Sequence, residues 1–455
     1  MAQRLGALVL AAGKGTRMPS DKPKVLQRLL HEPLLRYVLD ALRPLFGDEV
    51  WAVVGHQAEM VRKAFADGNP RFVEQREQLG TGHALMTALP ALEAAGCERL
   101  LVLNGDSPLV SSVVLKNFVQ QAEGAELAFA CLRLDDPAGY GRVVRRDGRV
   151  LSIVEAKDFD PAVHGPFTGE VNAGMYCLNL EVARKLTPAL SRENKGGEYY
   201  LTDLVELALA AGHEVRGLDC GSDPGLFGIN SPVELAWSEA FLREKIVGEL
   251  LAGGVIIHAP ESVRIGPRAR IEPGAELTGP CEIYGASRVA QGARIESHCV
   301  LIDSSVESGA VLRSFCHLEG AQVGPDCTVG PFARLRPGAV MEEAAHMGNF
   351  VELKQACLRR GAKAGHLAYI GDADVGERAN IGAGAITCNY DGARKHKTII
   401  GADALIGSNT ALVAPVTVGG GALVGAGSVI TRDVPDGEMA IARGRQRNMP
   451  RRVKS

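Results

Sequence analysis

Aromatic residues are scarce in this chain of 455 residues, and it has no long apolar run. Phe, Tyr and Trp together make up 5% of the sequence, whereas glycine occurs 54 times. This combination is a first indication of a repetitive architecture. After Met-Ala-Gln-Arg the chain enters an apolar stretch of about five residues, which is too short for the core of a signal peptide or for a membrane span. We therefore expect a cytoplasmic protein without membrane insertion.

The chain also lacks cysteine spacings typical of a metal site and lacks a large net charge, which argues against a cysteine metal site and against nucleic acid as a partner. The ten cysteines include no C-x-x-C pair and no spacing with histidine that is typical of a metal site, so we expect reduced thiols. The formal net charge is only -3, which gives no electrostatic reason to expect nucleic acid as a partner. The length exceeds that of a usual single domain and predicts roughly two or three domains.

The first part of the chain, residues 1–230, alternates apolar runs with amphipathic stretches. This alternation predicts an α/β, Rossmann-like domain with a mostly parallel sheet that is covered by helices on both faces. The expected strands are residues 5–10, 50–54, 100–103, 127–132 and 175–178, and expected helices include residues 61–66 and 84–94. Ligands of such sheets bind at the carboxyl ends of the strands.

A strong helical pattern follows at residues 231–251, where Ser231 is suited to cap the helix and Pro232 to its first turn. We expect a helical linker over residues 231–254. From residue 255 onward, apolar residues recur every six residues and are often followed by glycine. The members of this period are Ile265, Ile271, Leu277, Ile283, Val289, Ile295 and Leu301, then Val323, Val329, Leu335 and Met341, then Ile400, Ile406, Leu412, Val418, Val424 and Ile430.

A period of six fits neither a helix nor a plain strand. It predicts a left-handed parallel β-helix over residues 255–455, in which each coil takes three short strands. The period breaks between Ile381 and Ile400, where we expect a polar, basic segment to leave the coil as a loop. Insertions in solenoids collect on a binding face, although a tolerated surface loop stays an alternative.

The stretch of residues 9–18 reads V-L-A-A-G-K-G-T-R-M and suggests a phosphate site. It fits neither a P-loop nor a dinucleotide-binding loop, because Met18 stands where the latter needs its third glycine. Gly13 and Gly15 still let backbone N–H groups approach an anion, and Arg17 and Lys24 add two cations. Alone, the stretch is explained equally well by a triphosphate site and by an ordinary strand-to-helix turn.

Polar residues at expected strand ends and turns add to this stretch. Gln75 and the glycine turn at residues 79–82 are suited to hold a flat base and favour a pyrimidine, without distinguishing uridine from thymidine. Asp106 follows a strand, which is the usual place for a Mg²⁺ ligand. Each of these residues also fits a structural part, such as a helix cap or a turn.

The combined motifs resemble a known family. The first part carries L-A-A-G-K-G-T-R-M with K-P-K, E-Q-L-G-T-G-H-A, G-D-x-P-L, D-P-A-G-Y-G-R, I-V-E-x-K-D and G-E-Y-Y-L-T-D, which resemble the sugar-nucleotide pyrophosphorylases. The second part carries G-P-F-A-R-L-R-P-G, G-N-F-V-E-L-K, K-A-G-H-L-A-Y-I-G-D, N-I-G-A-G-A-I-T-C-N-Y-D-G and K-T-I-I-G. Nearly the whole chain thus resembles the bacterial family that joins N-acetylglucosamine-1-phosphate uridylyltransferase to glucosamine-1-phosphate N-acetyltransferase.

The resemblance implies a bifunctional enzyme that makes UDP-N-acetylglucosamine, a precursor for peptidoglycan and lipopolysaccharide. Acetyl-CoA would acetylate glucosamine 1-phosphate in residues 255–455. N-acetylglucosamine 1-phosphate would then react with UTP in residues 1–230 and release pyrophosphate. The resemblance also implies Mg²⁺ and a homotrimer with acetyltransferase sites between subunits.

For uridylyl transfer, the resemblance implies in-line attack of the sugar phosphate on UTP, with catalysis by positioning and charge neutralisation. Asp106 and Asn230 would hold Mg²⁺, and Arg17 and Lys24 would neutralise phosphates. The residues implied in binding UTP and UDP-N-acetylglucosamine are Leu10, Ala11, Ala12, Gly13, Arg17, Lys24, Gln75, Gly80, Thr81, Asn104, Asp106, Gly141, Glu155, Asn172 and Asn230.

For acetyl transfer, the resemblance implies that His366 is the general base, since imidazole titrates near working pH. A lone histidine on a β-helix turn is otherwise more often structural. Glu352 would orient a neighbouring group. The residues implied in holding glucosamine 1-phosphate are Arg336, Lys354, Tyr369, Asn380 and Lys395, and those implied in holding acetyl-CoA are Ala383, Asn389, Tyr390, Ser408, Ala426 and Arg443.

Two other functions stay open from the sequence. A single-activity nucleotidyltransferase can use its β-helix only for assembly or regulation, and a scaffold can keep a relic nucleotide site. His366 and the segment with Asn389 and Tyr390 argue against the first, because a structural prism needs neither. The basic tail of residues 443–454 is either a frayed terminus or a contact for the phosphates of coenzyme A.

Overall fold

The computed structural model describes residues 4–450 apart from residues 14, 16, 17, 19 and 67–69. The chain divides into two compact units, Met1–Ala240 and Phe241–Ser455. Helix α8 (Pro232–Ala252) crosses this division, and the expected cap is confirmed because Ser231 Oγ accepts a hydrogen bond from the Glu234 amide at 3.2 Å. Of the helices in the described part of the chain, none combines the length and apolar character that crossing a membrane requires.

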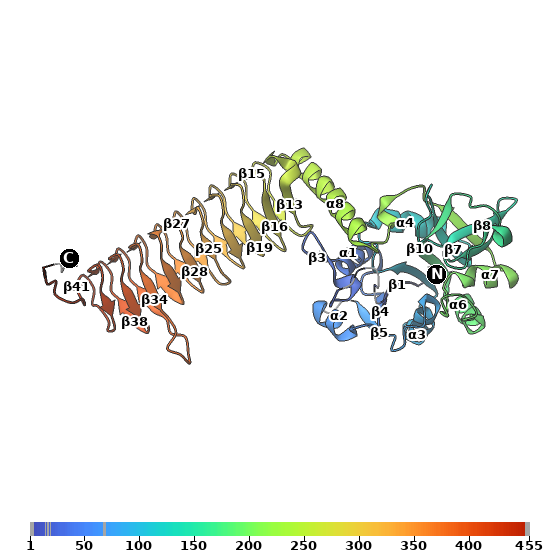
Figure 1. The fold of residues 1–455 in the computed structure, drawn as a ribbon, viewed down its shortest axis with the longest axis horizontal. Helices are drawn as coiled ribbons and strands as arrows, with labels where there is room; N and C mark the ends of the chain where they lie inside the picture. The colour runs from blue at the N-terminus through green and yellow to red at the C-terminus, as the bar shows by residue number, and fades with distance from the viewer. Residues whose placement is uncertain (1–3, 14, 16–17, 19, 67–69, 451–455) are drawn as a thin grey trace, which may run out of the picture. The chain divides into compact units, whose positions relative to one another are not determined.

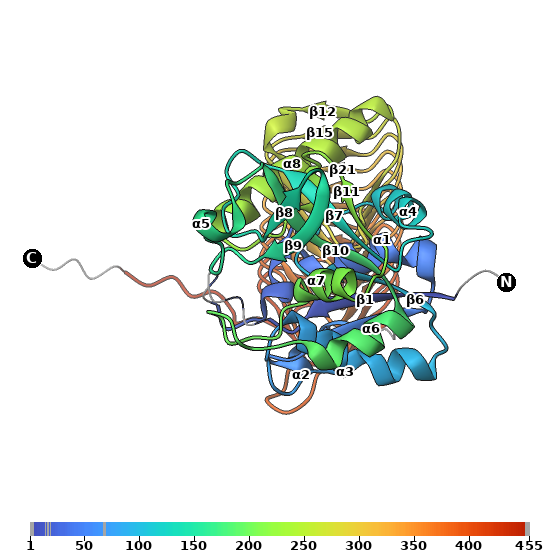
Figure 2. The ribbon, with the colours of Figure 1, turned by 90° about the vertical axis from the view of Figure 1, so that its right-hand side faces the viewer.

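The first unit is built on one sheet with helices on both faces (Figure 2). Its strand order is β11-β7-β10-β6-β1-β4-β5, with the hairpin β8–β9 attached to β10. The strands are β1 (Leu5–Ala11), β4 (Val50–Val54), β5 (Arg71–Glu74), β6 (Arg99–Asn104), β7 (Leu127–Arg133), β8 (Arg142–Arg146), β9 (Arg149–Val154), β10 (Glu170–Asn179) and β11 (Val215–Asp219), and β2 (Arg28–Leu29) and β3 (Glu32–Pro33) form a separate pair.

The helices of the first unit pack in two layers, one on each face of the sheet. Adjacent residues of β1 show this, because Val9 belongs to the core that contains α1 residues and Leu8 to the core that contains α3 residues. The helices are α1 (Leu34–Phe46), α2 (Ala58–Ala64), α3 (Thr81–Ala94), α4 (Ser112–Gln121), α5 (Pro161–His164), α6 (Leu180–Leu186) and α7 (Asp203–Ala210), with 3-10 turns η1 (Lys24–Leu26), η2 (Thr187–Ala189) and η3 (Pro224–Leu226).

The mostly parallel sheet is confirmed at its centre, where β1, β4, β5 and β6 run parallel. Strand β10 differs, since it lies antiparallel between β6 and β7. A fully buried apolar run has the same pattern in either direction, which is why the sequence did not reveal this reversal. Helix α2 also begins and ends earlier than the expected 61–66, because its exposed first turn adds nothing to a buried stripe.

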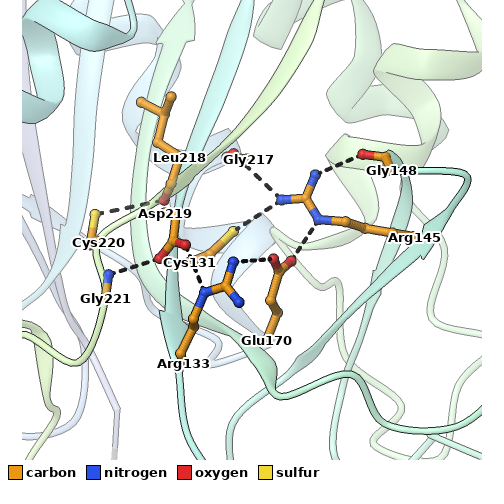
Figure 3. Close-up of polar contacts among 10 residues, drawn as sticks. All are labelled: Cys131, Arg133, Arg145, Gly148, Glu170, Gly217, Leu218, Asp219, Cys220 and Gly221. Carbon is orange, nitrogen blue, oxygen red and sulfur yellow. Dashed lines mark hydrogen bonds and ion pairs between the residues drawn. The ribbon is translucent and has the colours of Figure 1, made fainter.

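An ion-pair network fixes the edge of the sheet at β7, β8, β10 and β11 (Figure 3). Arg145 of β8 donates to Glu170 of β10 at 2.6 Å. Arg133 of β7 pairs with the same carboxylate at 3.7 Å and with Asp219 of β11 at 2.7 Å. Glu170 is only 9% exposed, so two guanidinium groups compensate a largely desolvated charge. The network holds the hairpin β8–β9, which leads directly into Glu155.

The second unit is a left-handed parallel β-helix, seen as stacked coils in Figure 1. Its strands form three parallel sheets, and each strand from β12 to β37 pairs with the one three places further along the chain, so that three strands make one coil; at the end of the coils, β39 pairs with β41. Every residue of the six-residue period is buried in one continuous core, which confirms the prediction. A 3-10 turn, η4 (Pro260–Ser262), lies near its start.

The 11-stranded sheet contains β12 (Ile256–His258), β15 (Glu276–Thr278), β18 (Arg294–Ile295), β21 (Val311–Leu312), β24 (Thr328–Val329), β27 (His346–Asn349), β30 (Lys363–His366), β33 (Asn380–Ile381), β36 (Leu405–Ile406), β39 (Leu423–Val424) and β41 (Met439–Ala440). The 10-stranded sheet contains β13 (Val263–Ile265), β16 (Cys281–Tyr284), β19 (Val300–Ile302), β22 (His317–Glu319), β25 (Arg334–Leu335), β28 (Glu352–Lys354), β31 (Tyr369–Gly371), β34 (Ile386–Cys388), β37 (Ala411–Val413) and β40 (Val429–Ile430). The 9-stranded sheet contains β14 (Arg270–Ile271), β17 (Arg288–Val289), β20 (Ser305–Val306), β23 (Gln322–Val323), β26 (Val340–Met341), β29 (Cys357–Leu358), β32 (Ala373–Val375), β35 (Thr398–Ile400) and β38 (Val416–Val418).

The polar insertion leaves the coils over fewer residues than expected. Strand β34 still pairs with β31 and β37, so only residues 389–397 form the loop that projects from the coils (Figure 1). Thr387 explains the difference. Its hydroxyl accepts from the Gly371 amide at 2.7 Å and donates to the Gly371 carbonyl at 2.9 Å, which satisfies a polar side chain at a buried position.

One corner of the coils carries a stack of exposed rings, here named the aromatic stack. It consists of His298, Phe315, Phe332 and Phe350, whose neighbouring ring centroids lie 4.5, 4.7 and 5.3 Å apart. All four residues have a positive φ, which is uncommon outside glycine, and so does Leu367 in the next coil. Phe332 is 47% exposed and Phe350 is 56% exposed. The corner therefore presents a continuous edge of stacked rings, of which the three phenylalanines are apolar.

Candidate functional site

Two adjoining cavities lie at the carboxyl ends of β1 and β6. The first has a volume of about 600 Å³ and the second of about 360 Å³. They share a wall formed by Leu10, Thr81, Asn104, Asp106 and Asn230. Two molecules bound in these cavities would therefore meet at Asp106 and Asn230.

The predicted nucleotide residues gather in these cavities. The first is lined by Leu10, Ala11, Ala12, Gly13, Lys24, Gln75, Gly80, Thr81, Asn104, Asp106 and Asn230. The second adds Gly141, Glu155 and Asn172. Arg17 lies outside the described residues. Residues that the sequence did not assign also line the cavities, and Gln78, Tyr176, Glu198 and Thr202 are among them. Glu198 and Thr202 belong to the motif G-E-Y-Y-L-T-D, which was the available signal.

The pairing of β1 with β6 brings the phosphate stretch to Asp106. Leu10 is opposite Asn104 in this parallel pair, and the Gly105 amide donates to the Leu10 carbonyl at 2.9 Å. A Cβ atom on Gly105 would lie 3.3 Å from the Cβ of Ala11 and 3.2 Å from Val25. Glycine between Asn104 and Asp106 thus permits the close approach of the two strand ends.

Asp106 has the features of a cation ligand. Its Oδ2 contacts the ammonium of Lys24, which also donates to Asn230 Oδ1 at 2.7 Å. Its Oδ1 is buried, and no described residue forms a hydrogen bond with it. An unpartnered carboxylate oxygen beside an amide oxygen fits a hard divalent cation. Across the described residues, no three His, Cys, Asp or Glu side chains converge to hold a metal, so further ligands would have to come from phosphate or water.

Gln75 is buried and held in one orientation. Its side-chain nitrogen lies 3.1 Å from the Gly80 carbonyl, to which it donates, and 2.9 Å from His83 Nδ1. The amide oxygen takes part in neither contact. The side chain is therefore fixed so that its oxygen can accept a hydrogen bond from a base.

The second cavity is acidic. Thr202 Oγ1 donates to Glu155 at 3.1 Å, and burial raises the pKa of the Glu155 carboxyl. Next to Thr202 in the chain but outside the lining of the cavity, Asp203 has its pKa raised to about 6 by burial and by the charge of Glu155. Asn172 is also fixed, because its side chain donates to the Tyr176 hydroxyl at 2.7 Å and accepts from the Gly174 amide at 3.0 Å. Such acceptors suit a polyhydroxylated ligand.

The second unit holds a histidine–amide pair at the corner of the aromatic stack. His366 ends β30 opposite Asn349 of β27, and its Nδ1 lies 2.6 Å from Asn349 Oδ1. Because an amide oxygen only accepts, this contact assigns a proton to His366 Nδ1, and in the neutral imidazole Nε2 then carries the lone pair. Asn349 was not predicted, although it lies in the motif G-N-F-V-E-L-K.

Basic residues converge on the neighbouring sheet. Arg336 pairs with Glu352 at 3.1 Å. The close approach of the Lys354 ammonium lowers the pKa of Lys395, which comes from the projecting loop. Two adjacent ammonium groups repel each other unless an anion joins them. This place therefore suits a phosphate.

The remaining predicted residues lie on the loop and along the corner. Asn389 contacts Asp372 and donates to the Tyr369 hydroxyl at 3.5 Å. The exposed Tyr390 donates to Gly392 within its own loop at 2.6 Å. The four residues implied in holding acetyl-CoA lie in successive coils, in the order Ala383, Ser408, Ala426 and Arg443. Hydrogen bonds at 2.8 Å from Asn409 N to Ala383 O and from Gly427 N to Ser408 O connect the first three of these coils. The Arg443 guanidinium contacts Ala426 O from the last coil.

Asn380 is not brought to His366 within one chain. It lies on β33 opposite Lys363, three residues before His366 in the register of β30. Three residues of a strand span roughly 10 Å. Asn380 therefore reaches the same site only from another copy of the chain or through an extended ligand.

Comparisons with known proteins agree with both units. Residues 7–160 match the MobA-like NTP transferase domain, and residues 397–432 match the hexapeptide repeat of succinyl-transferase. The chain is 61% identical over 455 residues to Bifunctional protein GlmU of Nitratidesulfovibrio vulgaris strain DP4, covering 100% of both chains. It is 50% identical over 446 residues to Bifunctional protein GlmU of Lawsonia intracellularis, covering 98% of both chains. The chain belongs to the GlmU family of bifunctional uridylyltransferase–acetyltransferases.

Proposed function

We propose that the first cavity holds UTP and the second holds N-acetylglucosamine 1-phosphate, and that the corner at His366 holds glucosamine 1-phosphate and acetyl-CoA. Residues 1–230 then carry uridylyl transfer, residues 255–455 carry acetyl transfer, and residues 231–254 connect them. The enzyme acts in the cytoplasm. The observation that carries the second activity is the His366–Asn349 pair together with the adjacent ammonium groups of Lys354 and Lys395, because a structural prism needs neither.

In uridylyl transfer, the shared wall of the cavities is the place of reaction. The phosphate oxygen of the sugar attacks the α-phosphorus of UTP in line, and pyrophosphate leaves. Lys24 neutralises phosphate charge, and Asp106 with Asn230 holds Mg²⁺. When bound, Mg²⁺ neutralises developing charge and orients the phosphates. The buried, unpartnered Asp106 Oδ1 supports this metal assignment.

Gln75 selects the base. Its amide nitrogen is occupied by Gly80 and His83, so its oxygen faces the ligand as an acceptor. The N3–H of uracil is a donor at this position, whereas the N3 of cytosine is an acceptor. The arrangement thus favours UTP over CTP.

In acetyl transfer, the amine of glucosamine 1-phosphate attacks the thioester carbonyl of acetyl-CoA. His366 Nε2 takes the proton from the attacking amine. As the C–S bond breaks, the resulting imidazolium gives a proton to the leaving sulfur, so that coenzyme A leaves as its thiol and the histidine is neutral again. Asn349 keeps the required tautomer through the Nδ1 contact. Lys354 and Lys395 hold the sugar phosphate, which removes the repulsion between their ammonium groups.

Both reactions are measurable on one preparation, by thiol release from acetyl-CoA and by pyrophosphate release from UTP. We expect Asn349→Ala to lower kcat for thiol release by roughly 10- to 100-fold, because the histidine loses its orienting partner. The pH profile of kcat/KM should shift, which a merely structural role would not produce. Pyrophosphate release should be unchanged.

Asn349→Asp is the matched control, since it keeps an acceptor oxygen at the same place and should retain most of the activity. If wild-type enzyme released no thiol from acetyl-CoA with glucosamine 1-phosphate, the acetyltransferase assignment would be wrong. Equal loss in the alanine and aspartate variants would instead contradict the role of Asn349.

We further propose a homotrimer in which the aromatic stack packs against neighbouring copies and places Asn380 of one copy near His366 of another. Two observations support this assembly. The exposed rings adjoin His366, and within a single chain Asn380 does not lie opposite that histidine. Burial of apolar surface drives such association.

The double variant Phe332→Glu/Phe350→Glu tests this assembly, because charge on the stack opposes burial. We expect light scattering to report a monomer where the wild type is a trimer, and thiol release to fall at least about tenfold. Pyrophosphate release should persist. Val163→Glu adds a charge at an exposed apolar position of α5 and should leave the trimer intact. A double variant that stays trimeric would contradict the proposed interface.

A further inference from the structure

The ammonium of Lys24 lies between Asp106 and Asn230. It contacts Asp106 Oδ2 and donates to Asn230 Oδ1 at 2.7 Å. The Lys24 side chain is 12% exposed and that of Asp106 is 20% exposed, so this is a largely desolvated ion pair.

The stem of this lysine is fixed by its surroundings. A Cβ atom on Gly15, whose φ is +62°, would lie 2.7 Å from the Lys24 Cβ. Only glycine permits the chain at residue 15 to pass so close to the lysine. The stem of Lys24 is thus fixed by the fold, whereas its ammonium is held only by the contacts with Asp106 and Asn230.

The position of the ammonium is the one that a divalent cation needs. Asn230 Oδ1, to which Lys24 donates, is one of the two protein ligands assigned to Mg²⁺, and the other ligand is the Asp106 carboxylate, whose Oδ2 the same ammonium contacts. An ammonium and a metal ion cannot both occupy the space between them, and the two positive charges repel at short range. Binding of the metal therefore requires that the Lys24 ammonium move.

We propose that Lys24 is an internal counter-ion, which occupies the cation position between Asp106 and Asn230 while the nucleotide site is empty and moves to the phosphates when metal and nucleotide bind. The inference rests on the proposed metal role of Asp106 and Asn230. It goes beyond phosphate neutralisation, because it makes Lys24 a competitor of the metal in the empty enzyme.

This competition links the two ligands of the site. A metal ion that binds alone must displace the Lys24 ammonium, which then has no new partner. When UTP binds with the metal ion, the phosphates of UTP can accept the hydrogen bonds of the displaced ammonium. The nucleotide should therefore strengthen metal binding, and the metal should strengthen nucleotide binding by the same factor. Removing the lysine should weaken this coupling.

Mn²⁺ is a suitable probe, because the electron paramagnetic resonance signal of the free ion measures binding without any turnover. We expect Lys24→Met to bind Mn²⁺ alone roughly tenfold more tightly than wild type, which is within the usual range of coupling between sites. The further gain in Mn²⁺ affinity on adding UTP should be smaller in the variant than in wild type. Lys22→Met is the matched control, since it removes an exposed ammonium from the same segment and should bind Mn²⁺ like wild type.

A measurement on wild type covers the case in which Lys24→Met does not fold. Acetylation by an N-hydroxysuccinimide ester, followed by mass spectrometry, reports the reactivity of the Lys24 amine. Mn²⁺ alone should increase this reactivity several-fold while that of Lys22 stays constant. Unchanged Lys24 reactivity under saturating Mn²⁺ would overturn the inference.

The outcomes separate this inference from the metal assignment. If Mn²⁺ binds with the same affinity to wild type and Lys24→Met, Lys24 does not compete with it and only the inference fails. If Mn²⁺ binds to neither protein, with or without UTP, the metal role of Asp106 and Asn230 fails and the inference fails with it. Asp106→Asn should abolish Mn²⁺ binding in the absence of nucleotide.

Discussion

Replacing His366 by alanine should lower the rate of thiol release from acetyl-CoA by roughly 10²- to 10⁴-fold, the range typical of a general base. The amine substrate is protonated near neutral pH and needs an acceptor for its proton before it can attack. His366 Nε2 provides that acceptor, since Nδ1 donates to Asn349. The residual rate should rise with pH, because free amine then forms without the enzyme.

Pyrophosphate release by His366→Ala should equal that of wild type, since the nucleotide cavities belong to the other unit. His317→Ala removes an exposed histidine from the same β-helix and should affect neither reaction. A joint loss of both activities would argue against separate sites. An unchanged rate of thiol release would remove His366 from the mechanism.

Replacing Asp106 by alanine should have the opposite effect, with pyrophosphate release lowered by roughly 10²- to 10³-fold as a charge-stabilising group is lost. The dependence of the remaining rate on Mg²⁺ concentration should disappear. Stability should fall too, by about 3–5 kcal/mol at most, because the Lys24 ammonium loses the partner of a largely desolvated pair.

Asp21→Asn is the control for Asp106→Ala, since it changes an exposed carboxylate near Lys24. It should leave the rate and the Mg²⁺ dependence unchanged. Urea denaturation and steady-state assays measure stability and activity separately. If Asp106→Ala kept a nearly normal rate, the metal assignment would be wrong.

The β-helix was the most predictable part of the fold. Its six-residue period is a property of every coil, so the apolar residues at this period, such as Ile265, directly indicate which side chains form the core. The end of the period at Ile381 was less informative, because Thr387 fills a core position with a hydroxyl that hydrogen-bonds to Gly371. Polarity alone therefore suggested a longer loop than the structure has.

The residues that line the two cavities were predictable as members of motifs, but their mutual contacts were not. Lys24 and Asp106 are 82 residues apart in the chain, and only the pairing of β1 with β6 brings their segments together. The same holds for Asn349, because a residue that acts through another side chain has no chemical signature of its own. The antiparallel direction of β10 was not predicted, because a fully buried apolar strand has the same sequence pattern in either direction.

The stacking of coils also sets the length of the ligand that the proposed acetyl-CoA residues would hold. Ala383, Ser408, Ala426 and Arg443 occupy successive coils, and neighbouring strands in a sheet lie about 4.8 Å apart, so three steps span roughly 14 Å. A thin, linear molecule with a charged end matches this distance, as the arm of coenzyme A does. Lengthening the solenoid by one coil between His366 and Arg443 would therefore separate the reacting end of such a ligand from its phosphate contact.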